Sequence, residues 1–180
     1  ECRERYCEAT VVFLEVGSLS GLFDRAAADE IRAYLKQIYG LCAHHVTLYN
    51  GFIVRFVGDA LAAVFGAPEA YDGDVESAVR AALEIREAVG LLPPFRGQSF
   101  TIRAGVQTGL LTFTVVRTPD QPRLEVLGPA PDIAQRLLAQ ARSGEILIGG
   151  QTCRLVRSLV DARSRGTLTM LNVDEPIEAF

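Results

Sequence analysis

Lysine is almost absent from this sequence: Lys36 is the only one, and every other basic residue is arginine. No apolar stretch reaches the length of a membrane span, because Arg55 and Asp59 interrupt the most hydrophobic region. The formal net charge of −4 gives no indication of nucleic-acid binding. The composition therefore argues against a membrane-embedded protein and against a nucleic-acid partner.

Cysteine is scarce and irregularly spaced. The four cysteines, at positions 2, 7, 42 and 153, match neither a zinc-binding pattern nor a Cys-x-x-Cys redox pair. Disulfide frameworks are typical of much smaller secreted domains, so we interpret these residues as reduced thiols. No signal-peptide pattern is visible, and together these observations predict a cytoplasmic location.

The overall amino-acid composition is typical of a globular domain. Of the 180 residues, 49% are hydrophobic and 22% are charged, which is enough apolar material for a sizeable core. No linker, repeat or low-complexity segment divides the chain. We therefore expect residues 1–180 to form a single domain, which we interpret as a fragment of a longer multidomain protein.

Hydrophobic periodicity predicts an α+β fold. Residues 52–57 and 60–66 have the pattern of strands joined by a tight turn at Gly58-Asp59, and residues 99–118 are expected to hold two strands with a turn near Gly109. Further strands are predicted at 9–16, 123–128 and 144–150, and helices at 22–46, 75–92, 129–142 and 151–160. This order predicts a split βαβ core, in which helices cover a mostly antiparallel sheet.

Four segments together resemble the catalytic domain of class III adenylyl/guanylyl cyclases of the bacterial type. They are VVFLEVGSLSGL, GFIVRFVGDALAAVFGAP, IRAGVQTGLL and VLGPAPDIAQRLLAQARSGEILIGGQT. The resemblance implies a ferredoxin-like palm that forms a homodimer or heterodimer, with active sites at the interface. It also implies attack of the ribose 3′-hydroxyl of ATP or GTP on the α-phosphate, which yields a 3′,5′-cyclic nucleotide and pyrophosphate. Two divalent metal ions, Mg²⁺ or Mn²⁺, would assist this step.

The resemblance assigns the metal sites to Glu15 and Asp59. Asp59 matches an aspartate that the family places in the hairpin turn, although Gly-Asp is also an ordinary turn sequence. Glu15 stands where the family has aspartate at the end of the first strand, so its side chain is longer by one methylene. Because a two-metal site requires placement to within about half an ångström, this change affects how the cation is held.

The resemblance also assigns substrate contacts. Gly17 and Ser18 begin a turn similar to the family's phosphate-binding turn. Arg55 and Glu125 occupy the two base-reading positions. Arg55 replaces the lysine of adenylyl cyclases or the glutamate of guanylyl cyclases, and it also fits a partly exposed strand residue.

Two further positions lie four residues apart on the predicted helix 129–142. Arg136 keeps the arginine that stabilises the transition state in the family, and Asp132 replaces the ribose-orienting asparagine. The spacing places both side chains on one helix face. Asp132 is also explained by the favourable interaction of a carboxylate with the beginning of a helix.

These assignments leave several functions open. The first is a nucleotide cyclase that favours ATP over GTP, with activity reduced by the altered positions. The alternative is a non-catalytic cyclase-homology domain that acts as a dimerisation or regulatory module, and a third is a chain that completes the active site of an intact partner. An RNA-binding ferredoxin-like domain is disfavoured by the acidic balance and by the absence of a basic aromatic sheet motif.

Overall fold

The structure is a computed structural model that describes residues 4–17, 27–57, 59–117, 122–168 and 176–180. A five-stranded path of antiparallel neighbours, in the order β2-β3-β1-β4-β5, forms the main sheet, and the short β6 adds to it in parallel beside β4. The elements are β1 (Glu4–Val16), α1 (Ala28–Leu48), β2 (Phe52–Val57), β3 (Ala60–Phe65), α2 (Asp74–Gly90), β4 (Ile102–Arg117), β5 (Pro122–Leu127), α3 (Pro129–Gln140), β6 (Ile146–Ile148), α4 (Gly150–Val156), β7 (Gly166–Leu168) and β8 (Ile177–Ala179). The predicted α+β class and split βαβ core are confirmed.

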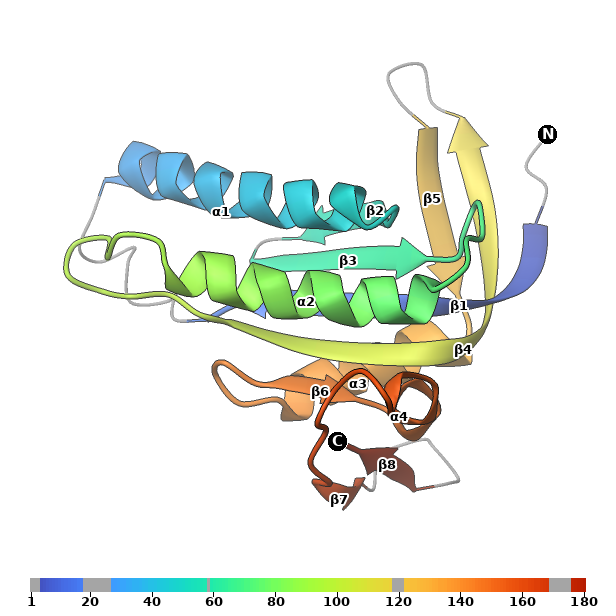
Figure 1. The fold of residues 1–180 in the computed structure, drawn as a ribbon. Helices are drawn as coiled ribbons and strands as arrows, with labels where there is room; N and C mark the ends of the chain where they lie inside the picture. The colour runs from blue at the N-terminus through green and yellow to red at the C-terminus, as the bar shows by residue number, and fades with distance from the viewer. Residues whose placement is uncertain (1–3, 18–26, 58, 118–121, 169–175) are drawn as a thin grey trace.

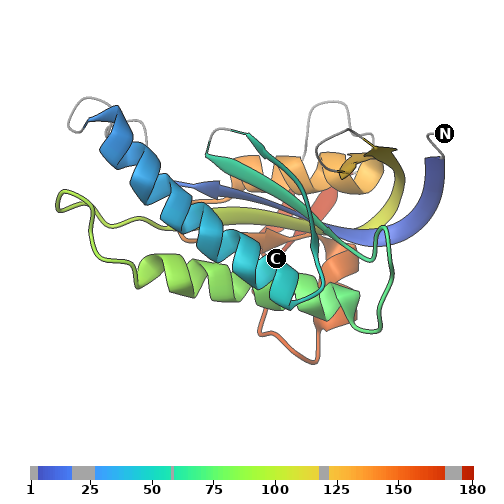
Figure 2. The same cartoon turned by 90° about the horizontal axis from the view of Figure 1, so that it is seen from above.

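The helices form layers on both faces of the sheet. Helices α1 and α2 cover one face, and α3 lies on the other (Figures 1 and 2). Strand β1 serves both layers, because successive side chains of a strand point to opposite faces. Val12 and Leu14 belong to the core beneath α1 and α2, whereas Val11 and Phe13 belong to the core beneath α3. This two-sided burial explains why β1 is a continuous apolar run in the sequence.

The prediction of two strands within residues 99–118 is wrong. Residues 102–117 form the single strand β4, which pairs with the whole length of β1, from Val16 opposite Ile102 to Glu4 opposite Thr114. Gly109 lies inside the strand, opposite Ala9, and its backbone has no left-handed conformation. Gly109 suggested a turn, but the pairing with β1 outweighs that weak local preference.

The long amphipathic helix is confirmed over Ala28–Leu48, and the predicted portion at 22–26 lies outside the described residues. Its buried positions, Ile31, Ile38, Cys42 and Val46, recur at helical spacing and face the sheet core. The second predicted helix corresponds to α2, and its inner face is unusually rich in alanine. Small side chains on this face allow α2 to pack closely against the sheet.

The expectations of reduced thiols and of no membrane-spanning segment can be compared with the described residues. Cys7, Cys42 and Cys153 are all free thiols, and burial raises the pKa of the Cys42 thiol to about 12. None of the described helices has the length and apolar character needed to cross a bilayer.

Candidate active site

The hairpin between β2 and β3 meets the end of β1. The Val16 N–H donates a hydrogen bond of 3.0 Å to the Asp59 carbonyl oxygen, and Glu15 lies opposite Ala60 in the β1–β3 register. The backbones of the two predicted metal ligands are therefore neighbours on adjacent strands. This placement follows from the antiparallel pairing of β1 with β3, which brings the hairpin turn beside the carboxyl end of β1.

The Glu15 carboxylate is held by an arginine. Arg103 is its cross-strand neighbour on β4, and its Nη2 donates to both Glu15 carboxylate oxygens, at 2.8 and 3.0 Å, while its Nε lies 3.2 Å from Oε1. Arg103 also donates from Nη1 to the Ala141 carbonyl oxygen at the end of α3, at 3.3 Å. Glu15 follows Phe13 in the alternation of β1, so this ion pair lies on the face of the sheet that α3 covers.

The Asp59 carboxylate is differently placed. It is half-buried, and no hydrogen bond or ion pair engages it among the described residues. Burial raises the pKa of the Tyr39 hydroxyl, and the negative charge of Asp59 raises it further, which places this carboxylate near α1. Among the described residues, Asp59 is therefore a carboxylate without a compensating cation, whereas Glu15 is already neutralised by Arg103.

The donor set can be tested against the divalent ions that the sequence predicts. Carboxylate oxygens are suitable ligands for Mg²⁺ or Mn²⁺, and Asp59 supplies two carboxylate oxygens that no described residue engages. Glu15 lies on the face that α3 covers, whereas the Asp59 carboxylate lies near α1, so Glu15 would have to leave Arg103 and turn toward the hairpin before its oxygens could face the same ion. Within the described ranges there is no cluster of three or more carboxylate, histidine or cysteine side chains that could hold a metal. The residues fit one cation at Asp59, and a second carboxylate depends on release of the Glu15–Arg103 pair.

A cavity of about 510 Å³ lies on the α3 face, next to this hairpin. It is bounded by β2, β3, β5 and the first turns of α3, and three predicted site residues line it: Arg55, Glu125 and Asp132. Its floor is apolar, with Phe13 and Ala62 contributed by the central strands. A pocket with an apolar floor and a few polar groups is the usual form of a small-molecule site.

A β-bulge aims Arg55 into this pocket. The β2–β3 register shifts between Ile53, which lies opposite Ala63, and Arg55, which lies opposite Ala62. Without the extra residue, Arg55 would lie opposite Leu61, whose side chain is in the core beneath α1 and α2. The bulge therefore places the Arg55 side chain on the same face of the sheet as Ala62, which is the face with the pocket. Bulges commonly redirect functional side chains in this way.

Glu125 lies at the rim of the pocket. Its neighbours in β5, Leu124 and Val126, pack into the core beneath α3, and Glu125 between them is exposed. Alternation along the strand turns its side chain away from that core.

The two helix residues are paired. Arg136 Nη2 lies 2.9 Å from Asp132 Oδ2, as the spacing of four residues predicts. Helix α3 begins with Pro129 directly after Gly128, whose φ of 130° puts it in a conformation that favours glycine. Asp132 lies in the first turn, where a carboxylate interacts favourably with the helix dipole.

The predicted phosphate-binding turn is only partly described. The Gly17 N–H donates to the Thr101 carbonyl oxygen at 2.9 Å, so the backbone at the end of β1 is fixed by the segment before β4. Ser18 lies outside the described residues.

Sequence reasoning missed Arg103. A signal was present, since an arginine stands within the apolar run of the segment IRAGV, where an unpaired charge would be costly. Knowing that its partner is Glu15 requires the β1–β4 register. The bulge at Arg55 left no comparable signal in the sequence.

This chain belongs to the family of adenylate and guanylate cyclase catalytic domains, whose sequence profile matches residues 2–176. It is a class III nucleotide cyclase domain. Among curated proteins it is 24% identical over 182 residues to Adenylate cyclase 1 of Rhizobium meliloti (strain 1021), and the match covers 94% of this chain and 27% of that protein. The chain thus spans about a quarter of the length of this relative.

Solved structures share the fold. The adenylyl cyclase CyaB from P. aeruginosa superimposes with a TM-score of 0.85 at 23% identity, covering 98% of this chain and 94% of that one. The catalytic core of a rhodopsin-guanylyl cyclase with converted specificity, in complex with ATPαS, gives 0.89 at 22% identity, covering 99% and 96%. These similarities support the architecture independently of the sequence profile.

Proposed function

We propose that this domain converts ATP, and GTP less readily, to a 3′,5′-cyclic nucleotide and pyrophosphate at a dimer interface. The observation that carries the proposal is the pocket next to the Asp59 hairpin, which Arg55, Glu125 and Asp132 line from three different elements. An ATPαS complex of a protein with the same fold is consistent with a nucleotide as the ligand.

Each predicted site residue has a role in this proposal. Arg55 and Glu125 contact the base, where a guanidinium donates hydrogen bonds and a carboxylate accepts them. Gly17 and Ser18 begin the turn that faces the triphosphate. Arg136 stabilises negative charge that develops at the α-phosphate, and Asp132 orients the ribose. Because Arg136 is paired with Asp132, turnover requires this pair to open or to shift toward substrate.

The two divalent ions that the family resemblance implies would need both Asp59 and Glu15 as ligands. Bound there, Mg²⁺ or Mn²⁺ would lower the pKa of the attacking hydroxyl and neutralise triphosphate charge. Asp59 offers its carboxylate directly, whereas Glu15 contributes only when Arg103 releases it. In this proposal the Glu15–Arg103 pair sets the low activity of the domain.

An exposed apolar patch supports a second copy of the domain as partner. Tyr6 lies opposite Thr112, which in turn lies opposite Leu127, and Leu110 lies two residues from Thr112 on the same face. The exposed fractions of Tyr6, Leu127 and Leu110 are 81%, 72% and 65%. Contiguous exposed apolar side chains of this kind are typical of protein interfaces. We propose that this patch contributes to the dimer contact.

The Glu15→Asp variant is expected to form cyclic AMP faster than the wild type, roughly tenfold or more. The shorter side chain draws the carboxylate back from Arg103 and toward the hairpin, so the second oxygen ligand becomes available. The measurement is cyclic nucleotide formation by the purified domain, with ATP and GTP in parallel and with Mg²⁺ or Mn²⁺. Isothermal titration of Mn²⁺ gives a second readout, in which the variant binds more tightly.

The wild-type result decides between the candidate functions. Slow formation of cyclic AMP supports the proposal. A dimeric wild-type domain that forms no product from either nucleotide, beside an active Glu15→Asp variant, would assign the natural chain to the alternative of a non-catalytic module. Activity that arises only after mixing with an intact homologous domain would instead indicate that this chain completes a partner's site.

The Arg55→Glu variant is expected to shift nucleotide preference from ATP toward GTP. Reversing the charge replaces hydrogen-bond donors with acceptors at the base pocket, which favours the donor groups of guanine, and the ratio of kcat/KM values should change by at least about tenfold. The Arg32→Glu variant is a suitable control, because Arg32 is an exposed residue of α1 outside this pocket. An unchanged ratio in Arg55→Glu would remove Arg55 from the base site.

A further inference from the structure

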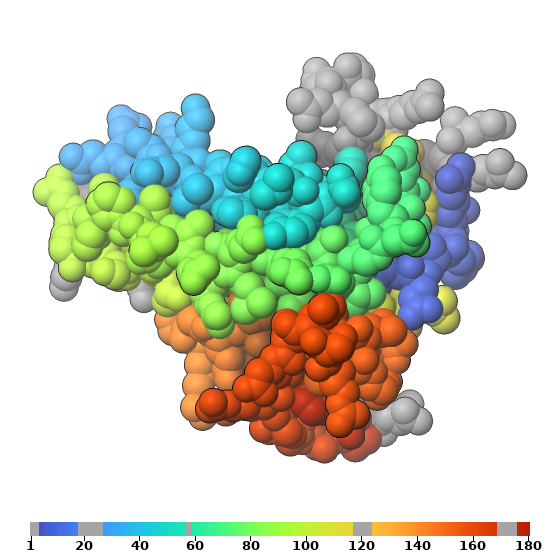
Figure 3. All heavy atoms as spheres, in the orientation of Figure 1, coloured from blue at the N-terminus to red at the C-terminus, as the bar shows by residue number. Residues whose placement is uncertain are grey.

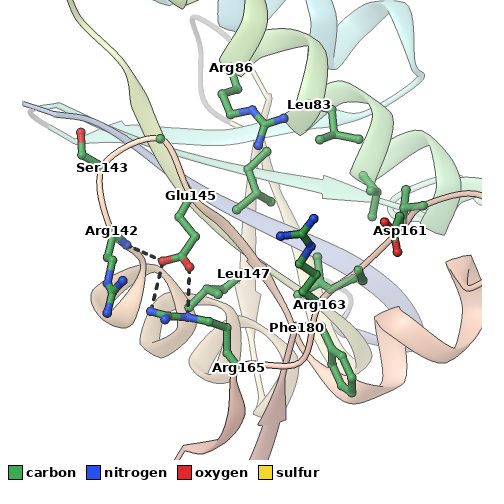
Figure 4. A pocket seen from close by; sticks show the side chains of 16 residues that line it. Leu83, Arg86, Arg142, Ser143, Glu145, Leu147, Asp161, Arg163, Arg165 and Phe180 are labelled. Atoms are coloured by element: carbon green, nitrogen blue, oxygen red, sulfur yellow. Dashed lines mark hydrogen bonds and ion pairs between the residues drawn. The ribbon is translucent and has the colours of Figure 1, made fainter.

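A second cavity, of about 600 Å³, shares no lining residue with the pocket that Arg55, Glu125 and Asp132 line. Its walls are helix α2, the segment 142–148 that leads into β6, and the segment 160–165 together with Phe180 (Figure 4). In the space-filling view, α2 lies directly against the C-terminal part of the chain that contains α4, and the cavity is at this junction (Figure 3). We call it the α2–β6 pocket.

Arginines dominate the charge of the α2–β6 pocket. Four of them line it, against two carboxylates, so the pocket has an excess of two positive charges: Arg86, Arg142, Arg163 and Arg165, with Glu145 and Asp161. One acid is already neutralised. Arg165 Nε lies 3.0 Å from Glu145 Oε1, and the backbone N–H of Arg142 donates to Glu145 Oε2 at 2.8 Å.

Among the residues that the structure describes, the guanidinium groups of Arg86 and Arg163 have no such partner. They come from α2 and from the 160–165 segment, and they point toward each other across the hollow (Figure 4). No ion pair or hydrogen bond of either side chain is formed with another described residue. Two like charges that converge without an ion pair to a described residue repel each other, so an anion between them would be stabilised.

The sequence of α2 explains why Arg86 is unpaired. On a helix surface, ion pairs form between residues three or four positions apart. Arg80 of the same helix follows this rule and lies 2.6 Å from Glu76. Around Arg86 the positions at this spacing are all apolar or glycine: Ala82, Leu83, Val89 and Gly90. Helix α2 therefore leaves this guanidinium available to a ligand.

Apart from Ser143, the remaining side chains that line the pocket are apolar. They are mainly aliphatic side chains from α2 and β6, with one aromatic ring: Val79, Leu83, Ile146, Leu147, Ile148, Val160 and Phe180. An inorganic anion would leave this surface unused. A ligand with an anionic group and an apolar body matches both parts, and the volume is in the range of small-molecule pockets.

We propose that the α2–β6 pocket binds a small organic anion, a phosphate ester or carboxylate with an apolar body. Arg86 and Arg163 donate hydrogen bonds to the anionic group, since guanidinium forks match the geometry of both anions. The apolar body lies against Leu83 and Phe180. The site is independent of the nucleotide pocket, so it would give the domain a place where a second molecule is sensed.

The probes are chosen to separate charge from apolar surface. Binding of 1-naphthyl phosphate is measured by isothermal titration and compared with 1-naphthoate, neutral 1-naphthol and inorganic phosphate. We expect naphthyl phosphate or naphthoate to bind at least about tenfold more tightly than naphthol and inorganic phosphate. Naphthol lacks the anionic group, and inorganic phosphate lacks the apolar body. The stronger of the two anions identifies the head group. Equal binding of all four probes, or of none, would overturn the proposal.

Variants locate the binding site. Arg86→Gln and Arg163→Gln should each weaken binding of the stronger anion on the order of tenfold, because each removes charged hydrogen bonds. Arg163 is exposed on a loop, so its variant keeps the test valid if Arg86→Gln folds poorly. Arg32→Gln, at an exposed position of α1, is the matched control and should not change binding. Loss of binding in Arg55→Gln, with both pocket variants unaffected, would move the ligand to the nucleotide pocket and refute the assignment.

Discussion

Replacement of Asp59 by asparagine is expected to lower cyclic nucleotide formation by the domain on the order of a hundredfold or more. Asp59 is the carboxylate at the proposed metal site that no described residue neutralises, and asparagine removes its charge with almost no change in shape. The backbone contact that fixes the hairpin, from Val16 N–H to the carbonyl oxygen of residue 59, does not depend on the side chain. The loss should therefore appear in turnover and in Mn²⁺ affinity, and not in thermal stability.

The matched control for this variant is Asp29→Asn. Asp29 is an acidic residue in the first turn of α1, its side chain is 93% exposed, and its nearest cation is 3.8 Å away. It should keep full activity, since exposed ion pairs contribute little. If Asp59→Asn retained wild-type turnover and wild-type Mn²⁺ binding, Asp59 could not be the cation anchor.

The sequence was most informative where one physical pattern repeated over many residues. Alternation and continuous apolar runs identified β1, β2 and β3, and helical spacing identified α1, α2 and α3, because each of these elements buries a face. The family resemblance then supplied the expectation of a ferredoxin-like palm. Element ends differ by a few residues, as in β1, which begins at Glu4 and not at residue 9.

The sequence was least informative where long-range pairing decided the outcome. Strand β4 contains the pattern QTGLLT, whose glycine suggested a turn, and only its pairing with β1 keeps it extended. The contact between Glu15 and Arg103 depends on the same pairing, across a separation of 88 residues. Site residues were found one by one from the family pattern, but which of them are already engaged could be known only from the fold.

The Gly105→Ala variant is expected to be strongly destabilised, by about 4 kcal/mol or more. Helix α3 crosses β4 so closely that a Cβ at position 105 would lie 2.1 Å from the Ala134 carbonyl oxygen and 2.4 Å from the Leu138 amide nitrogen. Both are backbone atoms, so no side-chain rotation relieves the overlap and α3 would have to move. Because α3 contributes Asp132 and Arg136, any protein that folds should also lose activity. For a domain of this size, thermal unfolding should shift by roughly 10 °C or more.

Gly109→Ala provides an internal control on the same strand. Position 109 also faces α3, but a Cβ there would lie 3.6 Å from the Ala130 Cβ, which is ordinary contact. We expect its free energy of unfolding to change by less than about 1 kcal/mol, since replacing a strand glycine by alanine is favourable where space allows. Equal destabilisation of the two variants would mean that glycine is needed along β4 for its backbone alone. A large difference between them would show that contact between the backbones of β4 and α3 is what requires Gly105, and that this contact fixes the position of the helix carrying the proposed catalytic arginine.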